Sequence, residues 1–126
     1  MQRIIGINLM ALVLLFIALN FAHPQLSGRE ARTNQNDSRL FEQARKALNE
    51  SNFAEARILF TNLIDIYPDS GYVPRAKLSI ADSWYSEHRF KQAESEYRDF
   101  ITFFPNRTEV AKVQRRINSI HRNTSF

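Results

Sequence analysis

The 126-residue chain contains no cysteine, which excludes disulfide bonds, cysteine nucleophiles and metal sites built from thiolates. Its three glycines are scattered, so neither a glycine-rich phosphate loop nor a G-x-S-x-G nucleophile elbow can form. His23, His88 and His121 have no second ligand at metal-binding spacing. We therefore expect no catalytic activity, no cofactor and no metal site.

Basic residues are concentrated at the carboxyl end of the chain. Residues 107–126 hold five Lys or Arg against one Glu, whereas residues 37–106 hold nine basic against eleven acidic residues. A basic end can contact nucleic acid, anionic lipid or an acidic partner, or can form a solvated helix face. It has no interleaved aromatic residues and no groove-reading motif, so we expect no nucleic-acid partner.

Residues 1–22 contain the one long apolar segment. Eleven apolar residues run without a break from Leu9 to Leu19, which is the length of the apolar part of an export signal. The wider stretch 4–22 barely reaches the ~20 residues that a membrane-spanning helix needs. The sequence therefore predicts a signal peptide or a membrane anchor without deciding whether it is cleaved. Residues 23–36 are polar and aperiodic, which predicts a flexible tether.

The rest of the chain repeats itself at an offset of 37 residues. The recurring positions are Phe53, Ala56, Phe60 and Tyr67-Pro68, which return as Phe90, Ala93, Tyr97 and Phe104-Pro105. A period of this length is typical of stacked helical hairpins, which usually hold other proteins. We expect a repeat domain over residues 37–122 and a tail over 123–126.

Apolar residues at helical spacing predict five helices in this domain. The first is expected to begin at the capping residues Asp37 and Ser38 and to end near residue 51. Asn52 and Glu55 have the spacing of a capping box for the second helix. Asn106 or Thr108 can cap the last helix, whose single apolar stripe and basic far side are typical of a terminal cap. We expect Trp84 and the phenylalanines to lie in the core.

The spacing from Ala56 to Pro68 and from Ala93 to Pro105, with an aromatic residue between, resembles the tetratricopeptide repeat. The implied fold is all-α: two tetratricopeptide helical hairpins and a C-terminal capping helix in a short right-handed α-solenoid, preceded by the apolar signal or anchor helix.

The segment YPDSGYVPRA at 67–76, followed by ADSWY at 81–85, narrows the resemblance. It is similar to the BamD-type proteins, the tetratricopeptide lipoproteins of the outer-membrane β-barrel assembly machinery. The resemblance covers about residues 39–116. It extends, less closely, to the periplasmic repeat domain of the cell-division coordinator associated with the Tol-Pal system. BamD-type proteins have a lipidated cysteine and about five repeats, whereas this chain has no cysteine and matches their amino-terminal repeats only.

The resemblance implies a non-catalytic scaffold in the bacterial cell envelope, periplasmic, membrane-anchored or outer-membrane-associated. Its partners would be β-barrel assembly components or extended peptide segments, with membrane contact through residues 4–22 if these are retained. The implied partner-binding groove is lined by polar residues on the first helix of each hairpin and on the last helix. They are Ser38, Glu42, Arg45, Asn49, Arg75, Ser79, Asp82, Ser86, Lys112, Arg116 and Ser119.

Three alternatives stay open at this point. One is an envelope scaffold of the Tol-Pal or cell-division kind. Another is a membrane-surface-binding repeat protein whose Arg115, Arg116 and Arg122 contact anionic head groups. The third is a truncated paralogue. The sequence does not identify the partner or the oligomeric state.

Overall fold

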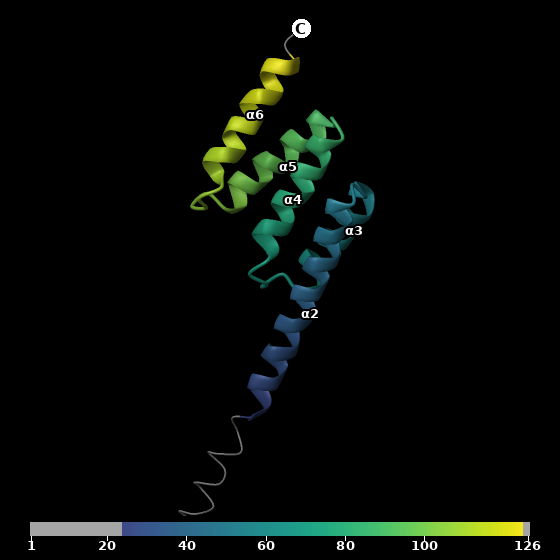
Figure 1. The fold of residues 1–126 in the computed structure, drawn as a ribbon. Helices are drawn as coiled ribbons and strands as arrows, with labels where there is room; N and C mark the ends of the chain where they lie inside the picture. The colour runs from purple at the N-terminus through teal and green to yellow at the C-terminus, as the bar shows by residue number, and fades with distance from the viewer. Residues whose placement is uncertain (1–23, 125–126) are drawn as a thin grey trace, which may run out of the picture. The chain divides into compact units, whose positions relative to one another are not determined.

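The computed structural model describes residues 24–124 and, from residue 34 onward, their side chains. The chain divides into two compact units, residues 1–34 and 35–126. Five α-helices make up the described part: α2 Pro24–Asn49, α3 Phe53–Ile66, α4 Val73–Ser86, α5 Phe90–Phe103 and α6 Val110–Thr124. No strand occurs within residues 24–124, so the all-helical fold is confirmed there (Figure 1).

The first described helix begins earlier than the sequence predicted. Residues 24–36 were expected to form a flexible tether, but they belong to α2, so Asp37 and Ser38 lie inside a helix and do not cap one. Good helix formers such as Gln, Glu, Ala and Arg dominate this stretch, and Pro24 stands at its first position, where its missing N–H costs little. The predicted signal or anchor lies outside the described residues. Among the helices that are described, none combines the length and apolarity needed to span a membrane.

Both helical hairpins close with the same turn. Ser51 and His88, which are 37 residues apart, have left-handed backbones with φ of 60° and 58°. The amide of Asn52 bonds the carbonyl of Ala47, and the amide of Arg89 bonds that of Trp84, both at 2.9 Å. These bonds form a Schellman motif, which satisfies the last carbonyls of the preceding helix. The hairpin turn therefore repeats at the level of single hydrogen bonds.

The capping predictions are wrong in detail. Asn52 precedes α3, but its side chain donates to the Glu55 carboxylate, and neither Asn52 nor Arg89 caps a helix through its side chain. Their φ/ψ angles are −83°/70° and −82°/65°, so the second hairpin loses nothing by having Arg at this position. Helix α6 begins at Val110, which puts Glu109, and not Asn106 or Thr108, immediately before it. The helix also extends to Thr124, into the predicted tail.

The connection from one hairpin to the next is likewise repeated. The amide of Ser70 bonds the carbonyl of Tyr67 at 3.0 Å, and the amide of Arg107 bonds that of Phe104 at 3.2 Å. The first connection has an additional tie, because the Ser70 hydroxyl donates to Asp37 Oδ2 at 2.6 Å. Asp37 is buried, and its second oxygen has no hydrogen-bond partner among the described residues. This tie fixes α2 to the turn that leads into α4.

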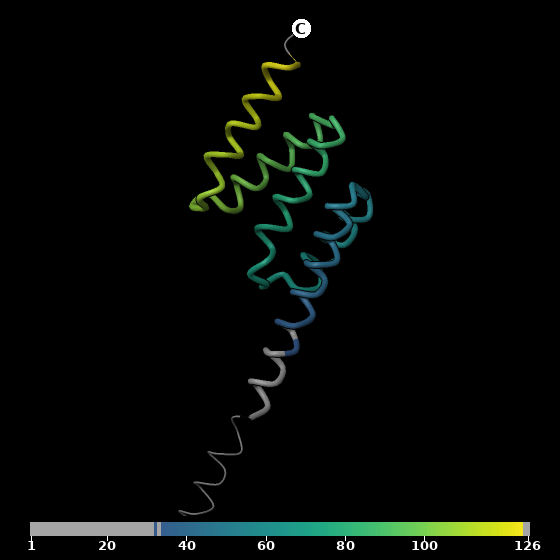
Figure 2. Tube along the Cα trace, in the orientation of Figure 1, coloured from purple at the N-terminus to yellow at the C-terminus, as the bar shows by residue number. Residues whose placement is uncertain are grey.

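Two apolar clusters form the core, one for each hairpin and its neighbouring helix. The first is centred on Phe41, Phe60 and Leu63, and the second on Tyr97, Phe100 and Ile117. Trp84 and Phe104 pack against both clusters and so join them. Fully buried alanines on the facing helices, such as Ala44, Ala56, Ala81 and Ala93, leave room for these rings. In Figure 2 the tube runs up α4, down α5 and up α6, as expected for consecutive hairpins.

Helix α6 is the counterpart of α4 displaced by 37 residues. It buries Val113, Ile117 and Ile120 against α5, as predicted for a terminal helix. At the positions where α4 carries the buried Ala81 and the half-buried Trp84, α6 carries the exposed polar residues Asn118 and His121. A polar outer surface lets a helix end a stack without leaving apolar side chains in water. Helices α4 and α6 therefore occupy equivalent places in the repeat, but α4 packs against a following helix, whereas the corresponding surface of α6 is polar, as in a capping helix.

Candidate functional site

The eleven residues predicted to bind a partner all lie on α2, α4 and α6, a set we call the first-helix surface. None of them is buried. Glu42, Arg45, Asn49, Arg75, Ser86 and Lys112 are exposed, and Ser38, Ser79, Asp82, Arg116 and Ser119 are half-buried. The surface is thus polar and accessible along the described part of all three helices, with charges of both signs.

At the centre of this surface, side chains from three helices meet around Asp82. The Tyr97 hydroxyl of α5 donates to Asp82 Oδ1, and Arg116 Nε of α6 lies 3.6 Å from the same oxygen. The Arg116 guanidinium also lies over the ring of Tyr85, 4.8 Å from its centroid. Burial, followed by the Asp82 carboxylate, raises the pKa of Tyr97 far above its ordinary value, so this phenol stays a donor. Asp82 and Arg116 are therefore brought together and serve first to join α4 to α6.

Elsewhere on the first-helix surface the predicted residues form local contacts. Arg45 pairs with Glu42 at 2.7 Å within α2, and Arg75 of α4 lies over the Phe41 ring at 4.9 Å. Ser38 and Ser86 donate to carbonyls in their own helices. Asn49, Ser79, Lys112 and Ser119 have no side-chain hydrogen bond or ion pair with any described residue. These four residues, together with Arg75, leave their side-chain hydrogen-bonding groups available to a partner.

The basic cluster predicted on α6 is divided by the fold. Arg115 and Arg122 are exposed, but Arg116 is half-buried and engaged with Asp82 and Tyr85. A membrane-surface role through all three arginines would require Arg116 to give up these contacts. This division weakens the lipid-binding alternative relative to protein binding.

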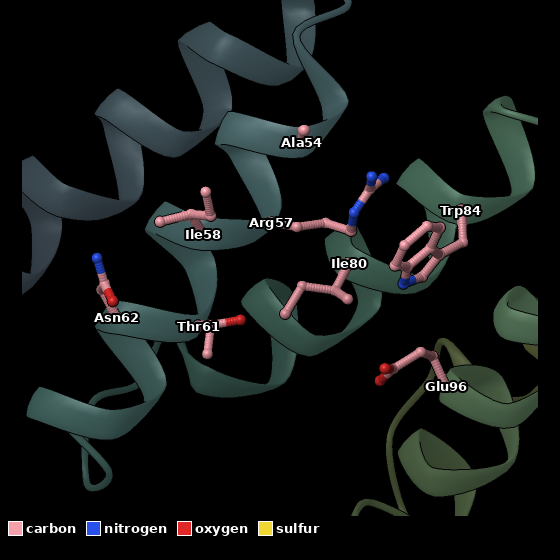
Figure 3. A pocket seen from close by; sticks show the side chains of 8 residues that line it. All are labelled: Ala54, Arg57, Ile58, Thr61, Asn62, Ile80, Trp84 and Glu96. Atoms are coloured by element: carbon pink, nitrogen blue, oxygen red, sulfur yellow. The ribbon is translucent and has the colours of Figure 1, made fainter.

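A second concave region was not predicted from the sequence. A pocket of about 540 Å³ opens between α3, α4 and α5, and Figure 3 shows Ile80 lying between α3 and Glu96. We call it the α3–α5 groove, because these helices form its walls and α4 its floor. Ile58 and Thr61 line one wall, Glu96 the other, and Ile80 and Trp84 the floor.

Arg57 closes one end of the α3–α5 groove. Its guanidinium lies 3.5 Å from the centroid of the Trp84 ring, pairs with Glu87 at 2.6 Å and donates to Ser83 at 3.1 Å. Trp84 was expected to be a core residue, but it is half-buried and lies under this cation. The repeat offset relates Arg57 and Trp84 to Glu94 and His121, whose side chains also meet, at 2.8 Å. The offset was the one sequence signal that could have indicated both contacts.

The acidic residues of α5 are in different environments, although their sequence pattern is that of one solvated face. Glu94 accepts from His121 and Arg98, and the His121 hydrogen bond is the main reason that its pKa is lowered. Glu96 is half-buried in the groove, and burial raises its pKa, with a smaller contribution from Asp99. No group of three or more His, Asp or Glu among the described residues is arranged to hold a metal ion.

Comparison with known proteins supports the resemblance carried by the repeats. No curated protein matches the sequence. The model of the YfiO family, described as outer membrane lipoprotein, matches residues 33–114, which is more than half of the chain and includes α3, α4 and α5 entirely. The similarity to BamD-type tetratricopeptide proteins is thereby confirmed, and this chain belongs to the YfiO outer membrane lipoprotein family.

Proposed function

We propose that this chain is a non-catalytic scaffold of the cell envelope, which serves outer-membrane β-barrel assembly by holding a protein partner on its first-helix surface. Two findings together support this proposal: the chain matches the YfiO family, and its first-helix surface is polar and accessible. Helical-repeat proteins use such extended surfaces to bind other chains. Family membership supports association with the outer membrane. We propose in addition that the partner is a β-barrel assembly component and that it binds the first-helix surface.

The first-helix surface suits an extended polar segment better than a single apolar side chain. None of the large exposed hydrophobic residues in the described part, Ile58, Ile66 and Phe103, lies on α2, α4 or α6. Asn49, Ser79 and Ser119 can both donate and accept, as the backbone of an extended peptide requires. Exposed Arg75, which has no ion pair with any described residue, adds positive charge for a carboxylate.

The proposed location in the cell envelope requires a means of attaching the protein to a membrane. BamD-type proteins have a lipidated cysteine, whereas this sequence has no cysteine. We propose that residues 4–22, if retained, provide membrane attachment instead, with the repeat domain on the periplasmic side. A Tol-Pal-type scaffold is the alternative, and it would differ in the partner it holds.

The test is an affinity pull-down of the tagged full-length protein from gently solubilised native envelopes. We expect the β-barrel assembly core to co-purify with the unaltered chain and recovery to fall at least fivefold with Ser79→Arg. Ser95→Arg, an exposed position on α5, is the matched control and should retain the partner. Recovery of Tol-Pal components, or equal recovery with both variants, would contradict the proposal.

A further inference from the structure

The α3–α5 groove lies away from the first-helix surface and has its own exposed apolar residues. Ile58, on the α3 wall, is 61% exposed, and Phe103, on α5, is 63% exposed. Phe103 follows Glu96 by seven residues, which puts both on the same side of α5. Large apolar side chains in water beside a concave surface mark interaction sites more often than solvated faces.

Beyond the lining of the groove, Phe103 of α5 lies beside α4. Lys77 of α4 lies one turn before the floor residue Ile80, and its Nζ is 5.2 Å from the centroid of the Phe103 ring. Trp84 lies one turn beyond Ile80. The floor therefore consists of Ile80 and Trp84, and the exposed Ile58 lies on one wall. Lys77 and Phe103 lie beyond the lining residues, next to each other.

The uncompensated charge of the groove is negative. The positive charge of Arg57 is matched by Glu87 at 2.6 Å. Glu96 is half-buried and has no hydrogen bond or ion pair with any described residue. The nearby Asp99 carboxylate raises the pKa of Glu96 further, and Lys77 acts on Glu96 in the opposite direction. A half-buried carboxylate without a partner favours a positively charged group brought by a ligand.

We propose that the α3–α5 groove docks a segment of a partner protein in which a large apolar side chain is followed by lysine or arginine. The apolar side chain enters between Ile58 and Ile80, and the cation pairs with Glu96. A second copy of this chain is a poorer occupant. Its exposed Ile66 is flanked by Asp65 and Asp69, which would bring acidic groups against Glu96. This inference does not depend on the first-helix surface.

The test uses the full-length chain in mild detergent and synthetic twelve-residue peptides that alternate Leu with Lys, Leu with Glu, or Ser with Lys. Trp84 is the single tryptophan of the chain and lines the groove, so its fluorescence reports occupancy. We expect saturable binding of the Leu-Lys peptide, at least tenfold tighter than of the other two. Glu96→Gln and Ile58→Ser should each weaken it about fivefold, and Glu96→Lys should reverse the preference toward the Leu-Glu peptide.

Two controls separate this proposal from its competitors. Glu50→Gln removes an exposed carboxylate from the start of the α2–α3 turn and should leave peptide binding unchanged. Arg45→Glu alters the first-helix surface and should also leave it unchanged, so failure of the proposed function would not affect this result. Equal binding of the Leu-Lys and Ser-Lys peptides, or no effect of Glu96→Gln, would overturn the proposal. Dimerisation that blocks the peptide in sedimentation experiments would assign the groove to a second copy instead.

Discussion

Ser51 and His88 show how single residues adopt a backbone that their side chains do not favour. Each lies in the left-handed region at the end of a helix, where glycine is the usual residue. A residue with a Cβ in this conformation costs roughly 1–2 kcal/mol. The Schellman hydrogen bonds at both turns hold them there. The structure thus keeps a small strain at each hairpin turn that one substitution can remove.

We predict that Ser51→Gly or His88→Gly raises the free energy of unfolding by about 0.5–1 kcal/mol, because the left-handed strain exceeds the added flexibility of the unfolded chain. Urea denaturation followed by circular dichroism measures this. Ser95→Gly, at an exposed position within α5, is the matched control and should lower stability by about 0.5 kcal/mol. A loss of stability at both turns would show that the side chains of Ser51 and His88 stabilise the folded state by more than their backbone strain costs.

The buried pair of Asp37 and Ser70 is the second test at this scale. Asp37→Ala should lower the free energy of unfolding by about 1–3 kcal/mol, because the Ser70 hydroxyl loses its acceptor at 2.6 Å. Ser70→Ala should have a similar effect, since it leaves a buried carboxylate without its donor. The double variant should lose less than the sum of the two. Strictly additive losses in urea titrations would mean that the two side chains do not stabilise each other.

Among the elements, α6 contributes more than its position at the end of the stack suggests. It covers Ala93, Tyr97 and Phe100 of α5 with three buried aliphatic residues. We predict that Ile117→Ala, at a residue 2% exposed, lowers the free energy of unfolding by about 2–4 kcal/mol. Lys112→Ala, exposed on the same helix, should change it by less than about 0.5 kcal/mol. Similar small effects in thermal unfolding would indicate that α6 is only loosely attached.

The contact between α5 and α6 should also make stability depend on pH. The His121 hydrogen bond lowers the pKa of Glu94 below 4.5 in the folded protein. The pair therefore contributes stability above the unfolded pKa, and this contribution is lost as pH falls through the folded value. Glu94→Gln should cost stability at pH 7 and progressively less below pH 4.5. Glu50→Gln, which removes only a 3.9 Å exposed pair, should give a difference that does not vary in this way. A pH-independent loss with Glu94→Gln would contradict the assignment.

Across the whole molecule, the helices and their order could be predicted because the apolar period and the repeat offset reinforce each other. The turns at 68 and 105 were predictable from proline, but the caps were not. Side chains such as Asn52 and Glu55 can bond each other as well as the backbone, and the sequence does not decide between these. The start of α2 was missed because residues 24–36 lack an apolar stripe, and their Gln, Arg, Glu and Ala residues are interspersed with Pro, Ser, Gly, Thr and Asn.

The first-helix surface could be proposed from the repeat pattern, whereas the α3–α5 groove could not. The groove depends on Arg57 stacking on Trp84 and on Glu96 being half-buried, and both arise from packing between hairpins. In the sequence, Arg57 is one charge within an apolar stripe, and Glu96 is one of several carboxylates on an exposed helix. Contacts of this kind follow from tertiary structure rather than from spacing.

Site-specific photo-cross-linking in native envelopes shows whether the first-helix surface holds a component of β-barrel assembly. A photoreactive residue would replace Asn49, Ser79 or Ser119 on this surface, and Lys91 or Ser95 on α5 as controls. We expect the three positions on the first-helix surface to give covalent adducts with a β-barrel assembly component, identified by mass spectrometry. The two α5 positions should give none. Adducts with Tol-Pal components, or adducts from the α5 positions alone, would contradict it.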